Sequence, residues 1–185
     1  EIVRDIDRGA KARVIVISHF GRPKGGPDAA LSLKPIAEAM ATALGRPGHF
    51  ATDCVGPEVD KLVEALKPGE ILLLENLRYH AGEEKNDPAF VAQLKRLCDL
   101  FVNDAFGASH RAHASVAGLP LALGGGAAGL LVQKEIDVFR EVLGREARYL
   151  PLGHARLAAA ALEDFIGSGG AFGLLLGGLT QIAID

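Results

Sequence analysis

The stretch Arg13-Val14-Ile15-Val16-Ile17-Ser18 decides how the rest of this sequence is interpreted. It is too short for a helix and too continuously apolar for a strand with one solvated face, so it predicts a strand buried on both faces of a parallel sheet. Two further apolar runs predict strands, ILLL at residues 71–74 and LFVN at residues 100–103, and a short strand is expected at residues 49–51.

Helical patterns alternate with these strands. Residues 33–44 carry apolar side chains at helical spacing before a terminal Gly45, and residues 57–66 begin at a proline. Asp87 is expected to cap a helix over residues 88–98, and a long helix is expected over residues 129–143. The alternation predicts an α/β fold, a parallel sheet with helices on both faces in a Rossmann-like three-layer αβα arrangement.

The two ends of the sequence are harder to interpret. Residues 1–9 are expected to be the end of a helix closed by Gly9, which indicates that a segment upstream is missing. In the C-terminal tail, residues 155–166 are expected to be helical and residues 172–176 to form a strand between glycines.

Composition excludes several classes of protein. With 185 residues, 49% of them hydrophobic, the chain can form one domain with a sizeable core. A net charge of −3 provides no general basic field for nucleic acid or anionic membranes, and no apolar run is long enough to span a bilayer. Cys54 and Cys98 are expected to be small buried residues in a reducing cytoplasm. Because no His/Cys/Asp spacing matches a zinc site, no protein-bound transition metal is expected.

Polar residues follow the predicted strand ends at residues 18–26, 75–80 and 103–113, and each segment contains an arginine. Ligands of an open parallel sheet bind beyond the carboxyl ends of its strands, and guanidinium groups match phosphate and carboxylate oxygens. These segments therefore predict a site for a small polyanion, formed by Arg22, Arg78 and Arg111. The nearby histidines are weaker evidence, because for His80, His110 and His113 a hydrogen-bonding role in a loop is at least as good an interpretation as ligand contact.

Two other motifs carry less weight. GGGAAG at residues 124–129 formally satisfies GxGxxG, but it does not follow a convincing strand, so a glycine-rich entry to a helix is favoured over a dinucleotide site. No GxxxxGK[ST] motif occurs, which excludes a P-loop. The acidic stretch at residues 82–87 is expected to be a solvated loop leading into the helix capped by Asp87.

Four stretches together carry a family resemblance: SHFGRPKG at residues 18–25, DCVGPEV at residues 53–59, LLLENLRYH at residues 72–80 followed by EEKNDP at residues 83–88, and VNDAFGASHRAHAS at residues 102–115. In identity, order and spacing they resemble the motifs of the phosphoglycerate kinases, with Phe20 where the family has leucine. The resemblance covers residues 13 to about 143 and is to the N-terminal, substrate-binding half of those enzymes.

The resemblance implies reversible phosphoryl transfer between 1,3-bisphosphoglycerate and ADP, giving 3-phosphoglycerate and ATP. Magnesium would accompany the nucleotide, and no cofactor is expected on this chain. The substrate 3-phosphoglycerate would be bound by His19, Phe20, Gly21, Arg22, Arg78 and Arg111. Catalytic residues are not assigned, because the family's first strand with its DFN triplet and the arginine after it would precede Glu1.

The resemblance also suggests a division of the chain. Residues 1–144 would be the substrate-binding domain without its first strand, and residues 145–185 a tail leading toward a missing nucleotide-binding domain. FGLLLGGLT at residues 172–180 is loosely similar to the family's entry into that domain. Thr180 stands where a phosphate-binding lysine is expected, so no nucleotide-binding role is assigned here. A cytoplasmic monomer is expected.

Two functions stay open at this point. One is the acid-binding lobe of the kinase, inactive without the other half. The other is a non-catalytic lobe that binds anions with no turnover of its own. Nucleic-acid binding is disfavoured by the acidic pI and the scarcity of aromatic residues.

Overall fold

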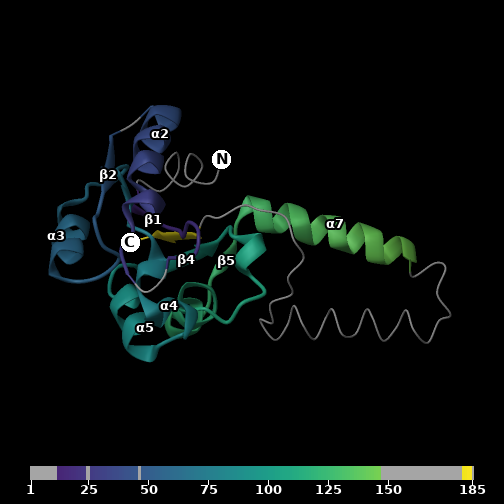
Figure 1. The fold of residues 1–185 in the computed structure, drawn as a ribbon. Coiled ribbons are helices and arrows are strands. Elements are labelled where there is room, and N and C mark those ends of the chain that lie inside the picture. The colour runs from purple at the N-terminus through teal and green to yellow at the C-terminus, as the bar shows by residue number, and fades with distance from the viewer. Residues whose placement is uncertain (1–11, 24–25, 46, 147–180, 185) are drawn as a thin grey trace.

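The computed structural model describes residues 12–23, 26–45, 47–146 and 181–184 (Figure 1). The elements expected at residues 1–9, 155–166 and 172–176 lie outside the described residues. In chain order the elements are β1 (Val14–Ile17), η1 (Ala29–Leu31), α2 (Lys34–Leu44), β2 (Gly48–Phe50), α3 (Pro57–Ala65), β3 (Ile71–Leu73), η2 (Leu77–Tyr79), α4 (Ala81–Glu84), α5 (Pro88–Lys95), β4 (Leu100–Asn103), η3 (Phe106–Ala108), the π-helical η4 (Ala114–Gly118), α6 (Leu119–Leu123), β5 (Ala127–Ala128), α7 (Leu130–Glu146) and β6 (Gln181–Ile184).

The strands form one sheet in the order β2-β3-β1-β6-β4-β5. The pairs β2–β3, β1–β3 and β4–β5 are parallel, as predicted. The exception is β6, which lies between β1 and β4 and runs antiparallel to both, with Ala183 opposite Ile15 and Phe101. The free backbone groups of β1 and β4 can pair with a strand of either direction, so the sheet is mixed at this one position.

Side chains of the sheet alternate between two layers of helices. Ile15 and Ile17 pack into a core with residues of α3 and α5, whereas Val14 and Val16 pack with Ala37 of α2. Figure 1 shows α2 on one side of the sheet and α4 and α5 on the other. The predicted three-layer αβα architecture is confirmed. Both cysteines are buried, also as predicted, and none of the described helices is long and apolar enough to cross a membrane.

Local chemistry sets the helix ends. The Asp87 carboxylate accepts hydrogen bonds from the backbone N–H groups of Ala89 and Phe90 at 2.8 and 3.2 Å, so α5 begins where predicted, although it ends at Lys95. Gly45 ends α2 in the left-handed conformation, with φ of 64°. Helix α2 begins one residue later than predicted, because Leu33 N donates to the side chain of Glu75 and is held outside the helix.

The glycine-rich stretch at residues 124–129 leads into α7 through the two-residue strand β5, which supports the helix-entry interpretation. Asp104 Oδ1 accepts from the N–H groups of Leu131 and Val132 at 2.7 and 3.2 Å and so caps α7. A Cβ atom at Gly129 would collide with the same carboxylate, so this position requires glycine. Helix α7 extends away from the sheet (Figure 1).

The prediction of a solvated loop at residues 82–87 is wrong. Residues 81–84 form α4, and the side chain of Glu83 is buried. Its carboxylate accepts hydrogen bonds from Ser115 N at 3.0 Å and Ser115 Oγ at 2.5 Å. Ser115 lies 32 residues further along the chain, so the acidic stretch itself gives no sign of the hydrogen-bond partner that offsets the cost of burying the Glu83 carboxylate.

Candidate anion-binding site

The predicted binding residues gather at one edge of the sheet. His19, Phe20, Gly21 and Arg22 follow β1, Arg78 lies in η2 after β3, and Arg111 follows η3 after β4. Since β6 runs opposite to both of its neighbours, β1 and β4 point the same way, and β3 is parallel to β1. The carboxyl ends of all three strands therefore meet at the same edge, as the sequence predicted.

Hydrogen bonds hold the loop after β1 against η2. Arg78 Nη1 donates to the carbonyl oxygen of Gly21 at 2.8 Å, and Asn76 Nδ2 donates to that of Phe20 at 2.7 Å. Gly21 has φ of 64°, and a Cβ atom there would lie 2.6 Å from the Leu31 side chain, so glycine is required at the bend. The side chain of Phe20 is exposed beside it.

The three arginines lie within electrostatic reach of one another. Burial lowers the pKa of Arg78, the Glu84 carboxylate opposes this shift, and the positive charges of Arg111 and Arg22 lower the pKa further. Like charges gathered in this way repel one another, and a bound anion would relieve the repulsion. The structure thus brings Arg22, Arg78 and Arg111 together.

Two histidines belong to the same cluster. Burial lowers the pKa of His19 to about 4, and Arg78, His113 and Arg111 contribute to the shift. The pKa of His113 is lowered by burial and then by Arg78 and Arg111. Both imidazoles are therefore neutral at pH 7 and can offer hydrogen bonds without adding charge. His113 was not among the predicted binding residues, and the signal that pointed to it was its position two residues after Arg111.

His80 does not join this cluster. Its Nε2 lies 2.6 Å from Asp53 Oδ1, and its ring stacks on that of Phe90 with centroids 5.0 Å apart. These contacts agree with a hydrogen-bonding role for His80 in its loop, outside the arginine cluster.

The side chain of Arg78 is incompletely paired. Its Nε is buried and, within the described part of the chain, has no hydrogen-bond partner; the Glu84 carboxylate lies 3.5 Å away. A buried donor without an acceptor costs about 1–3 kcal/mol, so native proteins rarely leave one unless a ligand or water supplies the acceptor. An anion at this edge of the sheet would supply it.

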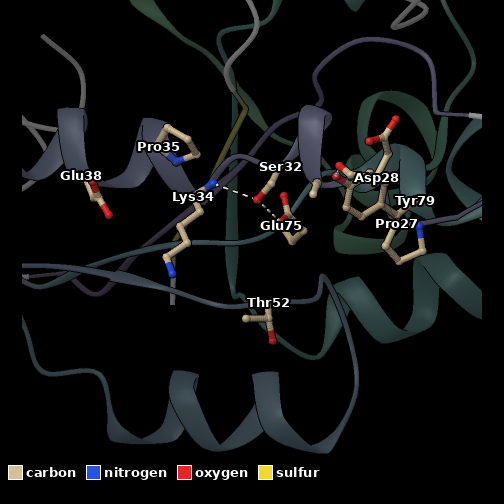
Figure 2. Close-up of a pocket in the computed structure, with 10 residues that line it drawn as sticks. Pro27, Asp28, Ser32, Lys34, Pro35, Glu38, Thr52, Glu75 and Tyr79 are labelled. Atoms are coloured by element: carbon tan, nitrogen blue, oxygen red, sulfur yellow. Dashed lines mark hydrogen bonds between the residues drawn. The ribbon is translucent and has the colours of Figure 1, made fainter.

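A cavity of about 500 Å³ lies elsewhere (Figure 2). None of the six predicted binding residues is among the described residues that line it, and its charged lining includes Asp28, Glu38 and Glu75 besides Lys34. Three carboxylates make this cavity a poor place for an anion. The arginine cluster has the chemistry for one.

An open α/β sheet whose carboxyl edge gathers three guanidinium groups and two neutral imidazoles places the chain in the class of α/β proteins. The family model for phosphoglycerate kinase matches residues 2–152. The chain therefore belongs to the phosphoglycerate kinase family.

Individual relatives agree with the family match. The chain is 54% identical over 143 residues to the phosphoglycerate kinase of Moorella thermoacetica, covering 77% of this chain and 36% of that protein. It is 51% identical over 140 residues to that of Rhodospirillum centenum, covering 76% and 35%. The solved phosphoglycerate kinase of Coxiella burnetii is similar with a TM-score of 0.63 and 32% identity, covering 75% of this chain and 34% of that one. The chain thus spans about a third of the length of its relatives.

Proposed function

We propose that this chain supplies the 3-phosphoglycerate site of a phosphoglycerate kinase, which transfers a phosphoryl group reversibly between 1,3-bisphosphoglycerate and ADP. The observation that carries the proposal is the convergence of Arg22, Arg78 and Arg111 at one sheet edge, with Arg78 Nε buried and without a hydrogen bond among the described residues. A molecule with a phosphate and a carboxylate matches such a group of guanidinium donors.

In the proposed chemistry these residues only bind and position the substrate. The acceptor carboxylate of 3-phosphoglycerate is already ionised at neutral pH, so it needs no general base. Arginine side chains would hold the substrate phosphate and orient the carboxylate, and the rest of the barrier would be lowered by electrostatic neutralisation and exclusion of water when two lobes close. His19 and His113 would add hydrogen bonds while neutral.

The nucleotide and its Mg²⁺ are assigned to the second half of the full-length enzyme. Magnesium prefers carboxylate and phosphate oxygens, whereas the residues gathered here are basic. No step of the proposed chemistry on this chain passes through the ion. The family's monomeric state and cytoplasmic location remain predictions.

The proposal is tested by measuring binding and turnover on the same preparation. Titration of the chain with 3-phosphoglycerate, followed by NMR shifts, is expected to give saturable binding in the millimolar range that Arg78→Ala weakens roughly 10-fold or more. Arg96→Ala is the matched control, because Arg96 is an exposed arginine paired with Asp60 on another surface. Loss of binding in both variants, or in neither, would contradict the proposed site.

The alternative is a lobe that binds anions without belonging to a working kinase. A coupled assay for ATP formation from 1,3-bisphosphoglycerate and ADP is expected to show no turnover by the chain alone. Adding a separately produced nucleotide-binding half from a homologous kinase is expected to restore measurable activity if the chain is the substrate lobe. Substrate binding that never supports turnover in such a mixture would favour the alternative.

A further inference from the structure

A second cluster of polar side chains lies where the strands β2 and β3 end. Asp53 and Cys54 come shortly after β2, and His80 closes η2 after β3. Because β2 and β3 are adjacent and parallel, their carboxyl ends meet. The His80 imidazole nitrogen, the Cys54 sulfur and an Asp53 carboxylate oxygen all lie within 4.8 Å of one another.

We propose that Asp53, Cys54 and His80 form a binding site for Zn²⁺ or another thiophilic divalent cation. Thiolate, imidazole and carboxylate are the three ligand types that zinc takes in proteins, and three protein ligands leave the fourth tetrahedral position for water. No residue of this set belongs to the arginine cluster, so the inference does not depend on the proposed function.

The geometry is close to what the ion requires. Tetrahedral zinc, with bonds of roughly 2.0–2.3 Å, holds its ligand atoms roughly 3.3–3.7 Å apart. In the structure His80 Nε2 and Asp53 Oδ1 are 2.6 Å apart, so the ion would have to separate them slightly. The Asp53 side chain is 54% exposed, which leaves it room for this small movement.

Supporting contacts orient the ligands. Stacking on Phe90, at an interplanar angle of 23°, fixes the ring of His80 with Nε2 toward Asp53. Asp53 Oδ1 also accepts from Cys54 N at 2.6 Å, which keeps the carboxylate beside the thiol. Such contacts outside the coordination sphere are what hold metal ligands in place. His80 and Asp53 are part-exposed and leave the ion a route from solvent, whereas Cys54 is buried.

Charge balance also fits a divalent ion. In the structure the Cys54 thiol donates to the carbonyl oxygen of Glu75 at 2.9 Å. On binding, the S–H bond would break, the proton would leave to solvent and a sulfur–metal bond would form. Thiolate, carboxylate and neutral imidazole with Zn²⁺ sum to zero charge, which suits a half-buried position.

This inference revises the expectation that the chain holds no transition metal. That expectation rested on spacing along the sequence, and the ligands here come from two loops that only the parallel pairing of β2 and β3 brings together.

The test uses Co²⁺ as a spectroscopic substitute for Zn²⁺ on the chain stripped of metal. Co²⁺ is expected to bind one to one with a thiolate-to-metal charge-transfer band, and Zn²⁺ is expected to displace it. The Cys98→Ser variant should keep the band, because Cys98 is the other buried thiol and lies outside the cluster. Cys54→Ser should abolish it and weaken Zn²⁺ binding by more than the roughly 10- to 100-fold that loss of an outer contact costs.

Asp53→Asn covers the case in which Cys54→Ser fails to fold, since Asp53 is exposed and its replacement keeps the shape of the side chain. It is expected to lower Zn²⁺ affinity at least about tenfold while circular dichroism stays unchanged. A folded Cys98→Ser chain that binds Co²⁺ without a charge-transfer band, or binds none, would overturn the proposal. So would a Cys54→Ser chain that retains the band.

Discussion

Glu75 and Arg78 both follow strand β3 and are only three residues apart, but their side chains differ in how completely they are hydrogen-bonded. The Glu75 carboxylate, 6% exposed, accepts hydrogen bonds from Ser32 Oγ at 2.6 Å and from the N–H groups of Leu33 and Asn76, both at 2.8 Å. Figure 2 shows Ser32 and Glu75 side by side, joined by this hydrogen bond. Arg78, in contrast, leaves a buried Nε without a hydrogen bond among the described residues and lies among like charges.

This difference in hydrogen bonding distinguishes a residue that stabilises the fold from one that is suited to bind a ligand. A buried polar group whose partners are complete, such as Glu75, serves the fold, because it ties the end of β3 to the beginning of α2. A buried donor that lacks a hydrogen-bond acceptor, such as Arg78 Nε, lowers the stability of the fold unless a ligand or water supplies the acceptor. Stability and binding should therefore respond in opposite ways when the two residues are replaced.

The largest effect is expected for Glu75→Ala. The replacement leaves the buried N–H groups of Leu33 and Asn76 without an acceptor, and each such loss costs about 1–3 kcal/mol. We expect the free energy of unfolding to fall by about 3 kcal/mol in urea denaturation. Glu58→Ala, which removes an exposed carboxylate paired with Lys61, should change it by less than about 0.5 kcal/mol. Equal effects of the two changes would show that Glu75 is not a structural anchor.

Arg78→Ala is expected to act on binding instead. Loss of one charge-assisted contact of about 1.5–3 kcal/mol corresponds to a fall of roughly 10- to 150-fold in affinity for 3-phosphoglycerate. The urea midpoint should fall much less than in Glu75→Ala, because the change removes one exposed hydrogen bond, from Arg78 Nη1 to the carbonyl oxygen of Gly21, together with a buried donor that lacks a hydrogen bond among the described residues. Arg22→Ala should weaken binding in the same direction but less, since Arg22 is exposed. If Arg78→Ala unfolded the chain while leaving affinity intact, the contrast with Glu75 would be wrong.

A smaller effect concerns the pH dependence of anion binding. Burial and the neighbouring Arg78 hold the pKa of His19 at about 4 in the free chain, and a bound anion would raise it. Anion affinity should therefore increase as the pH falls from 7 toward 5, measured with sulfate, which keeps its charge over this range. His19→Gln should flatten part of the increase, and the remainder is expected from His113, whose pKa is also lowered. A pH-independent affinity in the unmodified chain would contradict this prediction.

The smallest effect is expected for Glu83→Gln. Burial raises the pKa of Glu83 above its value in the unfolded chain, although hydrogen bonds from Ser115 oppose the shift. The folded state then holds the proton more tightly than the unfolded state. The free energy of unfolding therefore decreases as the pH rises above about 4.5. The difference in unfolding free energy between Glu83→Gln and the unmodified chain should shift in favour of the variant over that range. A difference that does not vary with pH would refute the assignment.

Several features of this protein follow from short-range chemistry and could be predicted. The buried strands, the cap at Asp87, the stop at Gly45 and the arginine after each of three strand ends depend on residues close together in the chain. The carboxyl-edge rule for parallel sheets then places Arg22, Arg78 and Arg111 together without coordinates. The family resemblance named the same residues.

Other features depended on contacts between distant parts of the chain, and only the tertiary structure decided them. Ser115 completes the pairing of Glu83, β6 enters the sheet antiparallel between β1 and β4, and the end of β2 brings Asp53 and Cys54 to His80. The apolar pattern of a strand predicts that the strand is buried, but it does not predict which strand lies next to it. Whether a buried polar group has hydrogen-bond partners likewise depends on residues far away in the chain, as the 32-residue separation of Glu83 and Ser115 illustrates.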